Sequence, residues 1–181
     1  NKTISKLDEA CRSLKQIAKS GKKILFVATK KQAKTIVAES AKSLNMPYIT
    51  ERWPGGLLTN FSTIRKSIKK MNSIDTMKED GTFDTLSKRE KLQIERTREK
   101  LELNFGSIEN MNRIPEAIFV VDINKEHIAV AEANKLGMRS YAMVDTNTNP
   151  KLVNFPIPAN DDSTKSTSKI MQIISEAIAE G

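Results

Sequence analysis

The strongest constraint on the fold is a set of short apolar runs without any alternation of polar and apolar residues. ILFVAT (24–29), AIFVVD (117–122) and SYAMVD (140–145) are apolar almost throughout and rich in β-branched side chains. Such runs are typical of strands that are buried on both faces of a parallel sheet. PYIT (47–50) and residues 155–157 are shorter strand candidates.

Helical patterns alternate with these runs. Residues 31–44, 125–136 and 164–179 each carry apolar side chains on one stripe, and the chain opens with a similar pattern that Gly21 ends. When strands and helices alternate at these lengths, each helix crosses over one face of the sheet and connects two parallel strands. The sequence therefore predicts an α/β fold with a doubly wound parallel sheet.

One segment breaks this alternation. Residues 61–113 contain no strand candidate, and two helical patterns flank the polar turn around Gly81. The second pattern begins at Ser87 with a capping-box sequence that ends at Glu90. We expect an antiparallel helical hairpin here, inserted into a sheet body made of residues 1–60 and 114–181.

The charge is concentrated in the first part of the chain. The net charge of the whole protein is +8, and residues 1–60, 61–113 and 114–181 carry +8, +3 and −3. A basic surface of this kind favours a polyanionic partner, because cations that contact phosphates release condensed counterions. The alternative is an ordinary solvated surface whose charge aids solubility.

The composition also excludes several classes of protein. Cys11 and His127 are the only cysteine and histidine, so the sequence cannot form an internal disulfide or a Cys/His zinc cluster. No apolar run approaches the ~20 residues that cross a bilayer, and the first residues lack a secretory signal. We expect a soluble intracellular protein with no membrane contact.

The turn after the first predicted strand is the first candidate site. It reads ATKKQA and has no glycine, so the chain contains neither of the common glycine-rich phosphate loops. Thr29 is expected to cap the following helix while Lys30, Lys31 and Lys34 face a phosphate. The alternative is that these lysines are only solvated at a helix start.

The segment ERWPGGLLTN (51–60) is the most distinctive in the chain. Arg52 and Trp53 precede a Pro-Gly-Gly turn whose backbone can approach a partner closely, which fits an RNA-facing loop. In the competing interpretation, Trp53 fills the gap between sheet and hairpin. A basic strip follows directly and, with Arg52, could track one phosphate backbone: Arg65, Lys66, Lys69 and Lys70.

Acidic side chains follow the later strands. Asp145, Asp161 and Asp162 fall at the same predicted sheet edge, where carboxylates could hold a divalent cation. Capping of the final helix by Asp161 or Asp162 is the simpler alternative. The sequence implies no other cofactor.

Several long strings resemble the bacterial small-subunit ribosomal protein two family, the S-two family. In order they are ILFVATKKQA, ERWPGGLLTN, DGTFDTLSKRE, IPEAIFVVDINKEHIAVAEANKLG and VDTNTNPKLVNFPIPANDD. The resemblance implies a Rossmann-like or flavodoxin-like body with an inserted α-helical coiled-coil hairpin. Family members usually begin with a further segment that bears a His-Phe-Gly-His-like motif, and we expect an N-terminal piece of this kind to be missing here.

The resemblance also implies a function. It implies a non-enzymatic structural component of the small ribosomal subunit in the cytoplasm, bound to small-subunit rRNA between head and body. The implied protein partners are neighbouring small-subunit proteins, including the mRNA-binding protein one, and no small-molecule substrate is implied. Two other classes remain open from the residues alone: an α/β enzyme that binds a phosphometabolite, and a stand-alone protein-interaction adaptor built on the hairpin.

Overall fold

The sheet is parallel throughout, as the apolar runs predict. This computed structural model describes residues 2–145, 148–160 and 163–181. Its five strands have the order β2-β1-β3-β4-β5, which is the order of flavodoxin-like sheets. They are β1 (Ile24–Val27), β2 (Tyr48–Ile49), β3 (Ala117–Val121), β4 (Arg139–Val144) and β5 (Phe155–Pro158).

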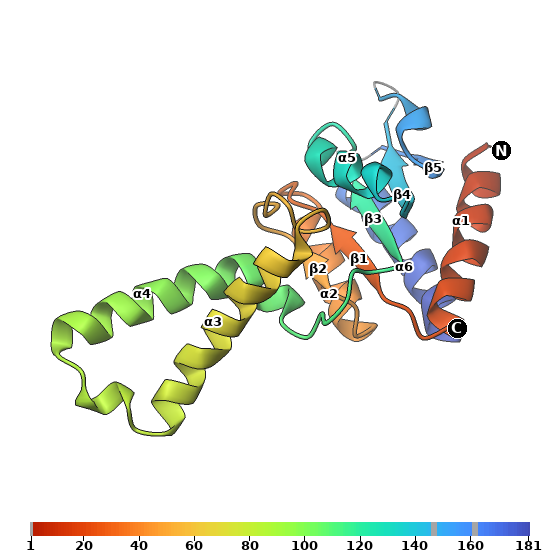
Figure 1. The fold of residues 1–181 in the computed structure, drawn as a ribbon. Coiled ribbons are helices and arrows are strands. Elements are labelled where there is room, and N and C mark those ends of the chain that lie inside the picture. The colour runs from red at the N-terminus through yellow and green to blue at the C-terminus, as the bar shows by residue number, and fades with distance from the viewer. Residues whose placement is uncertain (1, 146–147, 161–162) are drawn as a thin grey trace.

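Helices cover both faces of this sheet (Figure 1). One face is packed against α1 (Lys2–Lys19), α2 (Lys34–Ser43) and α6 (Thr164–Glu180). The opposite face is packed against α5 (His127–Lys135) and the first turns of α3 (Phe61–Glu79). The doubly wound architecture predicted from the sequence is therefore confirmed.

Successive residues of each central strand enter different cores. In β1, Phe26 packs in the first core while its neighbour Leu25 packs in the second. The same division separates Phe119 from Ile118 in β3, and the rings of Phe26 and Phe119 lie 5.7 Å apart. Burial of both faces explains why these runs carry no polar residue at alternate positions.

The inserted segment forms two helices that diverge from the sheet body (Figure 1). They are α3 and α4 (Lys88–Phe105), joined through the short 3-10 turn η1 (Phe83–Thr85). The predicted capping box is present, because Ser87 accepts from the Glu90 amide and the Glu90 side chain accepts from the Ser87 amide. Across the pair, Arg98 contacts Asp75 through two hydrogen bonds of 2.8 and 3.1 Å.

The base of this pair belongs to the second core of the sheet. Ile64 and Ile68 of α3 pack there together with Ile108 of the turn η2 (Gly106–Ile108). Farther out, Met71 of α3 is buried, whereas α4 contributes no buried side chain. That residues 61–113 form a unit separate from residues 1–60 and 114–181 stays a prediction.

One helix start differs from the sequence-based expectation and another agrees with it. α2 begins at Lys34, after an irregular turn, and its N-cap residue Ala33 makes no side-chain cap bond. α6 begins at Thr164, where Ser163 accepts a hydrogen bond from the Ser166 amide and caps the helix. Asp161 and Asp162 lie outside the described residues.

Within the described part of the chain, no helix combines the length and apolar character needed to span a membrane.

Candidate nucleic-acid interface

The carboxyl ends of β1 and β3 meet at the point where the direction of chain winding reverses. From β1 the chain crosses through α2 to β2, and from β3 it crosses through α5 to β4, so the two crossovers leave in opposite directions (Figure 1). In open α/β sheets this switch point forms the usual ligand crevice. Here the turn after β1 contains Thr29 and Lys30, and the turn after β3 begins with Asp122.

Side chains of the protein itself occupy this crevice. Glu126, only 3% exposed, accepts hydrogen bonds from both the amide (3.0 Å) and the hydroxyl of Thr29. Lys30 Nζ lies 3.3 Å from Asp122 Oδ2. The expectation that Thr29 caps α2 is therefore wrong, because its hydroxyl is used to bind a carboxylate from the neighbouring crossover.

Burial dominates the electrostatics of Glu126. Loss of solvent raises the pKa of Glu126 above its ordinary value, and this effect outweighs the hydrogen bonds from Thr29 and the charge of Lys125, both of which lower the pKa. The negative charge of Asp122 raises the pKa further. Such a carboxylate remains in place because Thr29 supplies it with two donors.

The other two lysines of this segment lie closer to solvent than Lys30. Lys31 is exposed. Lys34 lies in the first turn of α2 and its ammonium is 3.8 Å from a carboxylate oxygen of Glu51, an exposed pair that contributes little to stability. The structure thus divides the predicted phosphate-binding lysines, with Lys30 turned inward and Lys31 and Lys34 at the surface.

The ERWPGGLLTN loop is organised around a single buried carboxylate. Glu132 of α5 accepts hydrogen bonds from Trp53 Nε1 (2.8 Å), the Leu58 amide (3.0 Å) and the Thr59 amide (3.1 Å). The Gly56 amide and the Thr59 hydroxyl complete the set at 3.1 and 3.2 Å. Trp53 is 8% exposed and packs in the second core, as in the interpretation in which it fills the gap beside the sheet.

The pKa of Glu132 follows from this coordination. Burial alone would raise the pKa, but the hydrogen bonds from Trp53, Thr59, Gly56 and Leu58 together lower it below its ordinary value. A carboxylate with several donors is held in its charged form even when it is desolvated. The loop is therefore fixed to α5, and its exposed cation, Arg52, is presented from a rigid support.

The predicted basic strip lies on the first turns of α3. Lys66, Lys69 and Lys70 are exposed, whereas Arg65 is partly buried and donates to the Met111 carbonyl at 3.3 Å. The first 14 residues of α3 contain four basic side chains and no acidic one. A hollow beside the second half of α3 is lined by Lys69 and Asp80 together with Met77 and neutral polar side chains. The exposed lysines on the first turns, where no carboxylate lies in the helix, are better suited to a phosphate backbone.

The predicted cation site is not assembled from described residues. Asp145 is partly buried, but Asp161 and Asp162 lie outside the described part of the chain. Among the residues that the structure does describe, no group of three or more His, Cys, Asp and Glu side chains is placed to hold a metal ion.

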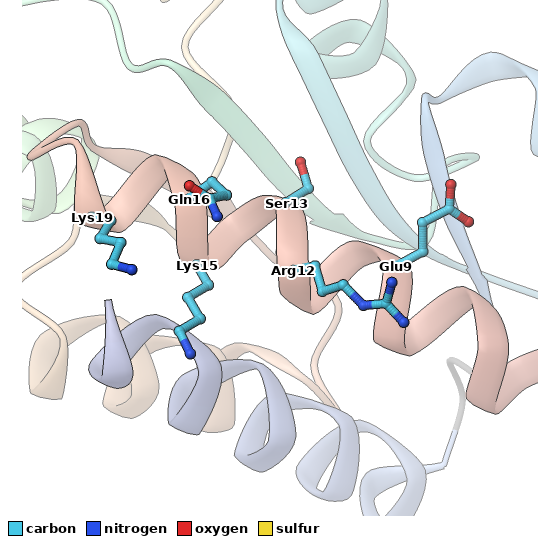
Figure 2. Close-up of a pocket in the computed structure, with 6 residues that line it drawn as sticks. All are labelled: Glu9, Arg12, Ser13, Lys15, Gln16 and Lys19. Carbon is cyan, nitrogen blue, oxygen red and sulfur yellow. The ribbon is translucent and has the colours of Figure 1, made fainter.

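A further hollow runs along α1 on the far side of the sheet (Figure 2). All its lining residues come from this one helix. Lys15 pairs there with Glu180 of α6 at 3.2 Å, and the Ser13 hydroxyl is bonded to the hydroxyl of Tyr141. None of the predicted binding residues lines this hollow. The lining residues are Glu9, Arg12, Ser13, Lys15, Gln16 and Lys19.

The residues that organise this region were missed by sequence reasoning. They are Glu126 at the N-terminus of α5 and Glu132 within α5, and neither was predicted to have a role. A signal was present for Glu126, because it precedes the buried residues Val130 and Ala133 by four and seven positions and so lies on the apolar stripe. A carboxylate on such a stripe must find donors in the fold.

Comparisons with known proteins agree with this architecture. The family described as Ribosomal protein S2 matches residues 1–181. The chain is 63% identical to the small ribosomal subunit protein uS2 of Flavobacterium johnsoniae over 99% of the chain and 71% of that protein. It is 64% identical to uS2 of Flavobacterium psychrophilum, over 99% and 68%, and 62% identical to uS2 of Phocaeicola vulgatus, over 100% and 65%.

The fold and the site together define the class of protein. It has a flavodoxin-like α/β body whose ligand crevice is filled from within, and a basic helical pair is attached to it. The chain belongs to the ribosomal protein S2 family. This membership confirms the prediction that the protein is not an enzyme.

Proposed function

We propose that this protein is a structural constituent of the small ribosomal subunit and binds small-subunit rRNA. The observation that carries the proposal is the exposed basic surface on the first turns of α3, which contain no acidic residue. Cations on a rigid helix neutralise phosphates at low entropic cost, and they position a protein on RNA without reading its sequence. The names of the relatives, which are small ribosomal subunit proteins, support the same role.

Within this proposal, the basic surface contacts the phosphate backbone. It comprises cations of the turn, the loop and α3, all exposed except the half-buried Lys34, and recognition is of RNA shape. Trp53 and Lys30 support this surface from inside. Its members are Lys31, Lys34, Arg52, Lys66, Lys69 and Lys70, with Arg65 at its buried edge.

The same proposal extends to the partners and the location. The protein lies between head and body of the small subunit in the cytoplasm, and the diverging pair α3 and α4 contacts neighbouring ribosomal proteins, including the mRNA-binding protein one. The exposed leucines Leu92 and Leu103 of α4 support a protein contact there, because removing their apolar surface from water would stabilise a complex.

The test is co-sedimentation with small ribosomal subunits over a range of salt concentrations. The double variant Lys66→Glu/Lys69→Glu should weaken binding strongly and flatten the dependence of log affinity on log salt. The matched control is Lys165→Glu/Lys169→Glu, which makes the same charge change on exposed positions of α6 on the other sheet face. Equal loss of binding in both variants would contradict a specific α3 interface.

The phosphometabolite enzyme receives no support from this geometry. The crevice in which such an enzyme would hold its substrate contains the Glu126 carboxylate and the Lys30–Asp122 ion pair. A phosphate would have to displace one carboxylate and approach another.

A further inference from the structure

The crevice at the switch point holds the donor groups of an anion site, together with an anion that the chain supplies. In open sheets of this type, backbone amides and small hydroxyls after the first strand face the phosphate of a bound ligand. In this protein the Thr29 amide and hydroxyl face the Glu126 carboxylate instead. Beside them, the Lys30 ammonium faces Asp122.

The segment that supplies these carboxylates is itself tightly folded. Asp122 has a left-handed backbone, with φ of 71°, which is uncommon for a residue with a side chain. Its other carboxylate oxygen accepts from the Asn124 amide at 3.1 Å, and its carbonyl accepts from the Glu126 amide at 3.1 Å. This compact turn places Asp122 and Glu126 side by side against the turn after β1.

We propose that Glu126 takes the place of the anionic ligand at the switch point and thereby holds residues 29–34 in the conformation that contacts RNA. This inference rests on the proposed function, since it assigns to Glu126 a positioning role for the RNA-contacting lysines. The position that binds a ligand in other proteins of this fold then serves to fix the turn after β1.

The burial pattern of the turn shows how the support acts. Thr29 and Lys30 are turned inward to the carboxylates, Lys31 and Gln32 are exposed, and Ala33 is fully buried. The turn is thus anchored on both sides of Lys31. Without the Glu126 contact, Thr29 would lose both of its bonds to this carboxylate, and α2 begins without a side-chain cap that could hold the turn in their place.

The experiment measures binding of purified small-subunit rRNA to folded variants. Glu126→Ala should weaken binding about as much as Lys31→Ala/Lys34→Ala, roughly ten-fold for two lost phosphate contacts. The combined variant should bind only slightly more weakly than either alone, because both changes remove the same phosphate contacts. Glu126→Gln should bind nearly as wild type, since its amide oxygen can accept the same two bonds from Thr29. Glu99→Ala, at an exposed site on α4, is the neutral control.

Chemical rescue separates positioning from a general loss of structure. Acetate should occupy the space left in Glu126→Ala, accept from Thr29 and restore RNA affinity, whereas chloride at the same ionic strength should not. Neither salt should restore Lys31→Ala/Lys34→Ala. Acetate and chloride acting alike on Glu126→Ala would overturn the proposal, as would wild-type affinity in that variant.

A milder pair of variants keeps the test decisive if Glu126→Ala fails to fold. Thr29→Val removes the hydroxyl donor alone and should weaken binding, while Thr29→Ser should restore it. Equal affinity in the two variants would overturn the inference. If Lys31→Ala/Lys34→Ala leaves affinity unchanged, the lysine contacts of the proposed function fail. If it weakens binding and the Glu126 variants do not, only the present inference fails.

Discussion

The indole N–H of Trp53 donates a 2.8 Å hydrogen bond to Oε2 of Glu132, and this contact joins the loop after β2 to helix α5. The two residues are 79 positions apart in the chain. Because the other oxygen of Glu132 accepts from Leu58 and Thr59, one carboxylate fixes the path of the whole loop. The loop lies between the sheet and the base of α3, so its geometry also sets where the basic helix leaves the body.

Removing this carboxylate should be strongly destabilising. Glu132→Ala leaves several buried donors without an acceptor, which costs about 3 kcal/mol of unfolding free energy and lowers Tm by about 10 °C in a chain of this size. Trp53→Phe, which removes one donor only, should cost about 1 kcal/mol. Trp53 is the only tryptophan, so its fluorescence in Glu132→Ala should shift to the red, while Glu99→Ala leaves both readouts unchanged.

The two buried glutamates should give opposite pH dependences of stability. The pKa of Glu132 is lowered in the folded protein, so its contribution is present above the unfolded pKa near 4.5 and is lost as the pH falls through the folded value. The pKa of Glu126 is raised, so its ionisation removes stability as the pH rises from about 4.5 through the folded value.

Thermal unfolding between pH 3 and 7 checks these signs. Glu132→Gln should reduce the loss of stability on acidification, and Glu126→Gln should reduce the loss of stability as the pH rises above 4.5, the ordinary value for both groups. A steeper loss on acidification in Glu132→Gln than in wild type would contradict the assigned lowering of its pKa.

The thiol of Cys11 should react slowly with alkylating agents in the folded protein. Burial, together with the negative charge of Asp8, raises its pKa to about 11 from 9.0. At pH 8 the thiolate fraction then falls by about 100-fold, and alkylation by iodoacetamide slows in proportion. The same reaction in denaturant supplies the reference rate. A folded rate equal to the denatured one would show that the thiol on α1 is exposed.

The outer part of the helical pair should depend on Arg98. The guanidinium of Arg98 donates to both carboxylate oxygens of Asp75 and also donates to Glu102 of α4 at 2.7 Å. The hydrogen bonds from Arg98 lower the pKa of Asp75. Arg98→Lys cannot form the paired contact, so it should lose most of what Arg98→Ala loses, about 1 kcal/mol. Hydrogen exchange of the α3 and α4 amides should become faster, while exchange in the sheet stays constant. Full protection in Arg98→Lys would show that a single ammonium suffices.

The sequence determined the parallel sheet, the helices that cover it and the paired helices between β2 and β3. It did so because a strand buried on both faces must be apolar at every position, as Leu25 and Phe26 are, and because a helix that covers a sheet must carry an apolar stripe. The basic residues of α3 were also evident, since four cations without an acid follow one another on one short segment.

Only the tertiary structure decided what each polar residue does. Whether Lys30 faces a ligand or Asp122, and whether Trp53 faces a partner or Glu132, depends on groups that lie 92 and 79 positions away. Local propensity carries no information about such distant partners. The buried carboxylates of Glu126 and Glu132 acquire their roles only when the crossovers bring donors from the turn after β1 and the loop after β2 against α5.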